Sequence, residues 1–312
     1  MFPDPGNRPD PRIEETSAHR KHQAGSSEAL ATVSHDVPVT SSSTTTRPGR
    51  TVHVERVMGT VVSFDLRRTG DHAAGIAAAV AWFHEVDARF STYRSDSEVS
   101  RFDRCEVPVD AMSPDLREVV AACDGLAAAS GGAFDARAGG RFDPSAYVKG
   151  WSVERAGRLL RAAGCADWTI DAGGDVLVAS SDTSRSPWRV GVQHPFDRAA
   201  LATVLEAHDL AVATSGRYER GDHIVDPRTG RTATAAASTT VCGADLGLAD
   251  AFATAAFVLG EEGPAWVATI PGYECSTVLD DGRVLATDGF PRVVAGVPVR
   301  TGAPTDLLGA VR

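Results

Sequence analysis

Residues 247–260, GLADAFATAAFVLG, are almost entirely apolar and predict a buried helix. Its only strongly polar side chains are Asp250 and Thr254, which are four positions apart and therefore share one helix face. A buried carboxylate is costly unless a cation or a hydrogen-bond donor faces it. A carboxylate beside a hydroxyl suits Mg²⁺, which binds oxygen ligands and keeps positions open for substrate phosphate. Alternatively, Asp250 caps the helix N-terminus and Thr254 bonds back to a backbone carbonyl.

A second candidate for chemistry is Lys149, within FDPSAYVKGWSVERA (142–156). The chain contains only two lysines, Lys21 and Lys149, against a strong preference for arginine elsewhere. A compact ammonium acts as a point charge on an anion or fixes a neighbouring carboxylate. The alternative is an exposed lysine at the start of a helix, beside Gly150.

A third candidate is the stretch ATSGRYERGDHIVDPRTGR (213–231), whose turn signals Asp226-Pro227 and Thr229-Gly230 predict a hairpin. The stretch also gathers hydrogen-bond donors of the kind that recognise a pyrophosphate. These donors are the side chains of His223, Arg228 and Arg231 and the backbone of Thr214-Ser215-Gly216. His223 also suits a general base, because the ordinary pKa of histidine lies near neutrality. A structural histidine is the alternative.

Two weaker signals accompany these. DAGGDVLV (171–178) has two glycines inside a strand pattern, which marks a bulge or a close approach by backbone or ligand. It lacks the GxGxxG spacing and a following helix, so a dinucleotide-binding Rossmann unit is excluded. The polar loop 91–103 offers Tyr93 as a stacking surface for an aromatic ring, near Ser97, Glu98 and Arg101.

The elements that must position these residues are mixed helices and strands without strict βαβ alternation, which predicts an α+β fold with a large, mainly antiparallel sheet. Residues 1–50 are polar and rich in Pro, Ser and Thr, and we expect a disordered tail before one domain over 51–312. The expected helices are 72–90, 113–131, 150–163, 247–260 and 262–270. The expected strands are 51–66 (a strand or hairpin), 168–180, 188–194, 202–216, 238–243, 274–280 and 283–290.

Composition limits the function further. The 312 residues carry a formal net charge of −10 and no basic stripe, which argues against nucleic acid or an anionic membrane as partner. The five cysteines are scattered and form no CxxC pair, as expected of reduced thiols in a cytosolic protein. No apolar run reaches the roughly 20 residues of a membrane helix, and the N-terminal residues lack a signal-peptide core. We therefore expect a cytoplasmic protein without membrane insertion.

Eight segments taken in order resemble the ApbE family of FAD:protein FMN transferases, over residues 52–295. The most specific are the DPxxG hairpin with its preceding histidine, the GGD strand and the D-A-x-A-T helix. The segments are MGTVVSF, STYRSDSEVSRF, GGAFDAR, DPSAYVKGW, DAGGDVLV, ATSGRYER, HIVDPRTGR and ADAFATAAFVLG. The resemblance implies an ApbE-like, T-fold-related architecture.

The resemblance also implies a reaction: Mg²⁺-dependent transfer of FMN from FAD to a Ser or Thr hydroxyl in the flavinylation motif of an acceptor protein, releasing AMP. Mn²⁺ is an alternative metal. Asp250 and Thr254 match the family's side-chain metal ligands, and Ala146 matches a backbone ligand. Asp250 and His223 are the catalytic residues implied, His223 as base or phosphate ligand. The FAD contacts implied are Met58, Tyr93, Asp143, Lys149 and the flavin-site stretch Arg137-Ala138-Gly139.

Two departures from the family pattern matter. This chain has DARAGGR (135–141) where the family often has DPTVGPL. Many relatives are exported lipoproteins, whereas the first cysteine here is Cys105 with no signal before it, which favours a cytosolic target. Two other functions stay open: a Mg²⁺-dependent FAD pyrophosphatase giving FMN and AMP, and a non-catalytic flavin-binding protein. The last is disfavoured because storage needs no metal on the anhydride, yet the chain retains Asp250, Thr254, Lys149 and His223.

Overall fold

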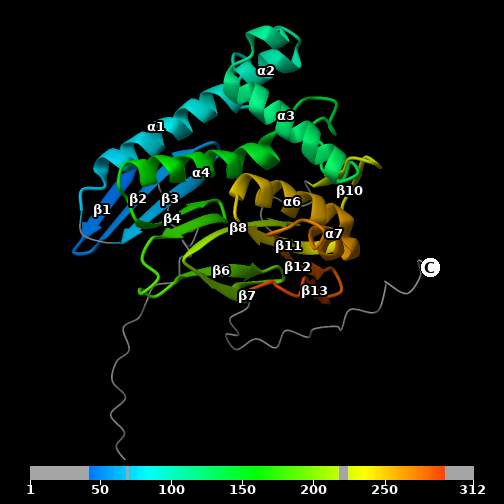
Figure 1. The fold of residues 1–312 in the computed structure, drawn as a ribbon. Coiled ribbons are helices and arrows are strands. Elements are labelled where there is room, and N and C mark those ends of the chain that lie inside the picture. The colour runs from blue at the N-terminus through cyan, green and yellow to red at the C-terminus, as the bar shows by residue number, and fades with distance from the viewer. Residues whose placement is uncertain (1–41, 68–69, 218–223, 292–312) are drawn as a thin grey trace, which may run out of the picture.

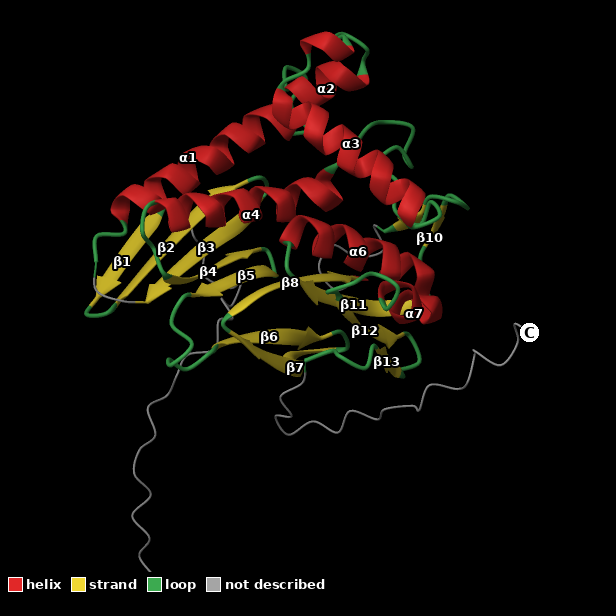
Figure 2. Ribbon diagram, in the orientation of Figure 1, coloured by secondary structure: helices red, strands yellow, loops and turns green. Residues whose placement is uncertain are grey.

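The computed structural model describes residues 42–67, 70–217 and 224–291. One large sheet carries helices on one face and a separate two-stranded sheet on the other (Figures 1 and 2). The helices are α1 (Ala73–Phe90), α2 (Glu98–Asp103), α3 (Pro114–Ala129), α4 (Ser145–Ala162), α6 (Leu246–Leu259) and α7 (Gly263–Val267), with 3-10 turns η1 (Val109–Ala111) and η2 (Gly260–Glu262). The strands are β1 (Ser43–Arg47), β2 (Arg50–Val57), β3 (Thr60–Arg67), β4 (Asp167–Ala172), β5 (Asp175–Ser180), β6 (Trp188–His194), β7 (Asp197–Ala207), β8 (Asp209–Gly216), β9 (Val225–Asp226), β10 (Arg231–Thr232), β11 (Ala236–Gly243), β12 (Glu274–Leu279) and β13 (Val284–Ala286).

The large sheet has nine strands in the order β1-β2-β3-β4-β5-β8-β11-β12-β13, and every neighbouring pair is antiparallel. This confirms the predicted α+β class with a large antiparallel sheet. The central strands are covered on both faces, and all eight residues of β11 are buried. Such strands are uniformly apolar or small because neither face meets water.

Helix α6 is apolar nearly all the way round because it is enclosed. It packs on β8 and β11 below and against α4 and α7 beside it, and 11 of its 14 residues are buried. Helix α1 is more one-sided, with Ile76, Phe83 and Phe90 buried on its inner face. The position of Asp250 within α6 therefore brings a carboxylate into the interior, next to α4.

The β6–β7 pair forms a second, smaller core on the opposite face of the sheet. Val190 and Val192 of β6 cluster with Val176 and Val212 of the large sheet. Trp188, at the start of β6, is buried, and its Nε1 donates to Asp167 Oδ1 at 2.9 Å. This hydrogen bond fixes the base of the β6–β7 hairpin to β4.

Most predicted elements are confirmed. Residues 51–66 fall in the β2–β3 hairpin, and Ser113 caps α3 by accepting a 3.1 Å hydrogen bond from Leu116 N. Several predictions differ from the structure in their bounds. Helix α4 begins at Ser145 rather than 150, because Asp143 Oδ1 accepts from Ser145 N and starts the helix earlier. The predicted loop 91–103 contains α2, which Ser97 caps.

Further differences concern where strands divide and where they begin. The single strand predicted over 202–216 is two strands, because β7 pairs with β6 while β8 joins the large sheet. Order also begins before the predicted boundary at residue 50, since β1 pairs with β2 from Ser43 onward. Residues 1–41 of the predicted tail and residues 292–312 of the predicted domain lie outside the described residues.

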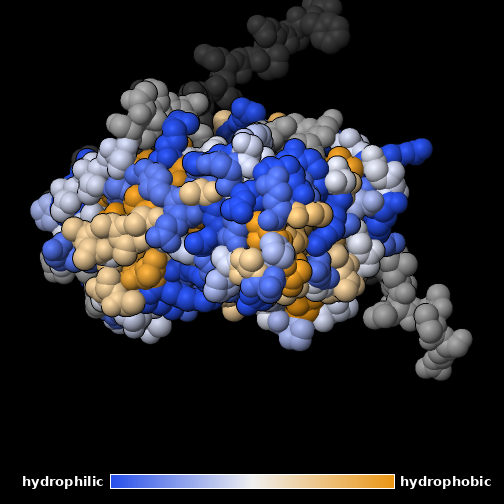
Figure 3. Space-filling view, turned by 90° about the horizontal axis from the view of Figure 1, so that it is seen from above, coloured by the Kyte–Doolittle hydropathy of each residue, from blue (hydrophilic) through white to orange (hydrophobic). Residues whose placement is uncertain are grey.

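Seen from the helical side, the surface is largely hydrophilic with smaller hydrophobic groups between (Figure 3). Within the described residues, no helix combines the length and the apolar character needed to cross a lipid bilayer.

Candidate functional site

A cleft of about 1380 Å³ opens beside the N-terminal half of α4. Its walls come from α4 and α6, from the β2–β3 and β4–β5 turns, from β8 and from the β6–β7 pair. Pockets for small molecules usually measure about 300–1000 Å³. This cleft is large enough for a dinucleotide.

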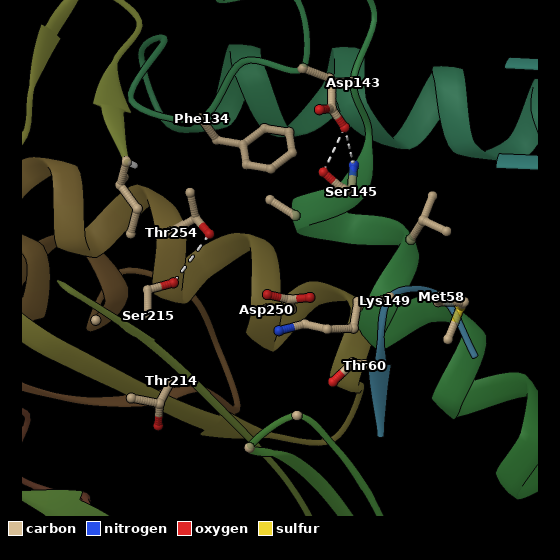
Figure 4. A pocket seen from close by; sticks show the side chains of 18 of the residues that line it. Met58, Thr60, Phe134, Asp143, Ser145, Lys149, Thr214, Ser215, Asp250 and Thr254 are labelled. Atoms are coloured by element: carbon tan, nitrogen blue, oxygen red, sulfur yellow. Dashed lines mark hydrogen bonds between the residues drawn. The ribbon is translucent and has the colours of Figure 1, made fainter. Parts of the chain in front are cut away.

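Asp250 and Thr254 both line this cleft (Figure 4). Asp250 is only 5% exposed, and its Oδ2 accepts a hydrogen bond from Gly150 N of α4 at 3.3 Å. The N-cap of α6 is Asp245, whose Oδ1 accepts from Leu248 N, so Asp250 is not the capping residue. Thr254 Oγ1 lies 3.2 Å from Ser215 Oγ of β8. The i,i+4 spacing brings a carboxylate and a hydroxyl to one wall, and β8 adds a second hydroxyl there.

Lys149 stands on the adjoining wall, and Figure 4 shows its side chain directed toward Asp250. Its Nζ lies 2.7 Å from Asp175 Oδ2, and Asp175 has a side-chain exposure of 1%. The other carboxylate oxygen of Asp175 accepts from Thr214 N at 3.2 Å. Lys149 thus fixes a neighbouring carboxylate, one of the two roles predicted for it, while a quarter of its side chain stays exposed at the cleft.

Met58 occupies the β2–β3 turn with a φ of 54°, a left-handed conformation that is uncommon for a residue other than glycine. Two residues with positive φ, here Met58 and Gly59, are what a tight two-residue hairpin requires. The turn abuts the β4–β5 turn, where a Cβ on Gly173 would lie 2.6 Å from Thr60 Oγ1. Both turns line the cleft, so the strained Met58 backbone is held at its edge.

Four more predicted residues line the cleft: Ala138, Gly139, Asp143 and Ala146. Tyr93 also lines it and is 97% exposed, as a stacking platform at the mouth would be. Arg137 is not part of the lining. Its Nη1 donates to Asp124 Oδ1 at 3.0 Å.

Only some of the hydrogen-bond donors predicted in the stretch 213–231 lie at the cleft. Arg228 is held by its neighbour Asp226, with Nε donating to Oδ1 at 2.9 Å, and neither Arg228 nor Arg231 lines the cleft. The residues Thr214, Ser215 and Gly216 do line it. His223 lies outside the described residues.

Two site residues were missed from the sequence. The Ser215 side chain was overlooked because only its backbone was considered as a donor. Asp175 was overlooked although it is a carboxylate at the head of an otherwise apolar strand, DVLVAS, which is the same signal that identified Asp250.

The helices that carry the site are tied together by Glu154 of α4, whose Oε2 accepts from Leu246 N at the start of α6, at 3.2 Å. Burial, the largest effect, raises the pKa of Glu154, while the Leu246 amide acts in the opposite direction. The link holds the α4 residues Ala146 and Lys149 in register with Asp250.

The donor set at Asp250 fits a hard cation. Among the described residues, no three His, Cys, Asp or Glu side chains gather into a metal-binding group. The oxygen donors on this wall are instead the carboxylate of Asp250 and the hydroxyls of Thr254 and Ser215. Oxygen donors with few charges suit Mg²⁺ or Mn²⁺, which retain positions for water and phosphate, better than Zn²⁺.

Comparison with known proteins places the chain in a family. The model of the ApbE family matches residues 58–140 and 136–277. A FAD:protein FMN transferase of Rhodobacter capsulatus is 37% identical over 156 residues, 47% of this chain and 30% of the relative. One of Treponema pallidum is 34% identical over 218 residues, 61% of this chain and 59% of the relative. The chain thus spans less than two thirds of either relative.

The fold is also that of a solved relative. The crystal structure of the ApbE protein of Thermotoga maritima superimposes with a TM-score of 0.69 at 22% identity, covering 77% of this chain and 98% of that one. The family match extends from the strained turn at Met58 past the helix of Asp250 and Thr254. This chain is a member of the ApbE family.

Proposed function

We propose that this protein transfers FMN from FAD to a Ser or Thr hydroxyl of an acceptor protein and releases AMP. The observation that carries the proposal is the buried Asp250 carboxylate, which faces a dinucleotide-sized cleft beside Thr254 and Lys149. Membership of the ApbE family and the names of the relatives support it. The acceptor carries a flavinylation motif, and we propose a cytoplasmic location for the reaction.

Asp250 and Thr254 would hold Mg²⁺, or Mn²⁺ in its place, through their side-chain oxygens, and Ala146 through its carbonyl. Such an ion neutralises the charge that builds on pyrophosphate oxygens as the anhydride breaks. Lys149 adds a positive charge on the adjoining wall, and Ser215 adds a hydroxyl donor. An acidic protein with a net charge of −10 needs such local positive charge to bind a dianionic substrate.

In the proposed reaction the acceptor oxygen forms a bond to the phosphorus of the FMN half. The bond between that phosphorus and the bridging oxygen breaks, and the bridging oxygen leaves with AMP. The hydroxyl proton passes to a base, for which we propose His223. Met58, Tyr93, Asp143 and the stretch Arg137-Ala138-Gly139 would contact FAD, with Tyr93 stacking on an aromatic ring at the mouth.

The test is incubation of the full chain with FAD, Mg²⁺ and a pool of synthetic peptides, each containing one Ser or Thr. Chromatography measures AMP, and mass spectrometry measures flavin addition to peptides. AMP together with a covalent FMN–peptide adduct is expected. AMP with free FMN and no adduct would replace the proposal with hydrolysis, and intact FAD would contradict both reactions.

A further inference from the structure

Two glycines meet where α4 crosses α6. A Cβ on Gly150 would lie 2.3 Å from the carbonyl oxygen of Leu246, far inside van der Waals contact. In the opposite direction, a Cβ on Gly247 would lie 3.1 Å from the backbone nitrogen and Cα of Trp151. Because the obstructing atoms are backbone, no side-chain rotation could relieve the contact. The two helix backbones touch only because both positions lack a side chain.

This contact brings one amide of α4 to a carboxylate of α6. Gly150 N donates to Asp250 Oδ2 at 3.3 Å, between residues 100 positions apart in the sequence. In a regular α-helix the same N–H would donate to the carbonyl four residues earlier, which is that of Ala146. An N–H has one proton. A hydrogen bond from Gly150 N to the Asp250 carboxylate therefore weakens any hydrogen bond from the same N–H to the Ala146 carbonyl.

Ala146 and Asp250 are the two proposed metal ligands that come from different helices. We infer that Gly150 is a positioning residue for the metal: its N–H orients Asp250 and weakens the helix hydrogen bond to the Ala146 carbonyl, which favours binding of the cation there. Glycine is required because any side chain would push α4 away from α6 and lengthen the hydrogen bond. The inference rests on the proposed function, since it concerns the same metal site. Hydrogen bonds that orient metal ligands commonly control affinity in this way.

The test measures Mn²⁺ binding, from the electron paramagnetic resonance signal of the free ion, at a fixed FAD concentration with a protein-free blank. Gly150→Ala is expected to raise the Kd for Mn²⁺ roughly 10- to 100-fold, the usual cost of removing a hydrogen bond that orients a ligand. High Mg²⁺ should partly restore AMP release in this variant.

The matched control is Gly157→Ala, the same substitution two turns further along α4. There the new Cβ would lie 2.6 Å from the Trp168 ring, so stability falls, but the neighbours are side chains of β4 and β5 rather than the backbone of α6. Its Kd for Mn²⁺ is expected to equal that of the unaltered protein. Gly247→Ala creates a milder contact of 3.1 Å and is expected to raise the Kd for Mn²⁺ by an intermediate factor. It replaces Gly150→Ala in the test if that variant fails to fold.

The outcomes separate this inference from the proposed function. Failure of the unaltered protein to bind Mn²⁺ would remove the metal site and the inference with it. Normal binding by the unaltered protein and equal binding by a folded Gly150→Ala would overturn only the inference. The inference would also be overturned if Gly157→Ala weakened Mn²⁺ binding as much as Gly150→Ala does. If Gly150→Ala does not fold, an unchanged Kd for Mn²⁺ in Gly247→Ala would overturn it instead.

Discussion

Lys149 and Asp175 form an ion pair between α4 and the head of β5, with Nζ and Oδ2 2.7 Å apart. Asp175 is almost fully buried, and its second oxygen binds the backbone of β8. The pair therefore joins a helix to two adjacent strands at the floor of the cleft, and it fixes the direction in which the Lys149 charge is presented.

Lys149→Met should destabilise the protein by about 3 kcal/mol, the lower end for a broken buried pair, because Lys149 remains partly exposed. Chemical denaturation measures the change. The double variant Lys149→Met with Asp175→Asn should recover much of the loss, since the neutral amide can still accept from Thr214 N. A double variant no more stable than the single one would refute this role for the pair.

Asp250→Asn should reduce AMP release at least about 100-fold, because the proposed metal loses its charged ligand. The amide oxygen can still accept from Gly150 N, so the hydrogen bond between α4 and α6 is retained. Asp245→Asn on the same helix is the control. Asparagine also caps helices well, so both activity and stability should stay close to those of the unaltered protein.

Glu154→Gln tests the buried link between α4 and α6. Because burial raises its pKa, folded Glu154 holds a proton more tightly than the unfolded chain does. Its contribution to stability is therefore present at acid pH and is lost as the pH rises through the raised pKa. Glutamine keeps an acceptor for Leu246 N.

Denaturant titrations at several pH values should show Glu154→Gln more stable than the unaltered protein near neutrality. The difference should shrink toward zero as the pH falls below the raised pKa. A difference that grows with acidity would have the wrong sign for a carboxyl whose pKa is raised by burial.

The five thiols should react very unequally. Cys105 is exposed, while Cys123, Cys165, Cys242 and Cys275 are buried. Burial raises the pKa of Cys242 and of Cys275 to about 12, so both stay protonated at pH 8. Titration of the native protein with a disulfide reagent should show one rapidly reacting thiol, and Cys105→Ser should abolish it. Two or more fast thiols would mean that the core opens readily.

Local signals in the sequence were sufficient for much of the fold and for the principal site helix. Ser113 and Pro114 mark the start of α3, and the unbroken apolar run of α6 marks a helix enclosed on all sides. Asp250 was identifiable because a lone carboxylate in such a run requires a partner. These features are local, so no knowledge of distant contacts is needed.

What the sequence could not reveal depends on contacts between distant segments. The donor to Asp250 is the backbone of Gly150, and a backbone amide has no signature in a sequence. Gly150 suggested the start of a helix, whereas it lies inside α4. A glycine is needed there because the Leu246 carbonyl occupies the space that a side chain would take. The division of residues 202–216 between two sheets likewise depends on distant pairing, because β7 pairs with β6 while β8 pairs with β5 and β11.

The most direct test of the central claim is a crystal structure of the protein with FAD and Mn²⁺, using anomalous scattering to locate the ion. An anomalous peak is expected roughly 2.0–2.2 Å from an Asp250 oxygen and from Thr254 Oγ1, with the FAD pyrophosphate as a further ligand. FAD bound in the cleft with no peak at these residues, or with the ion held elsewhere, would contradict the claim.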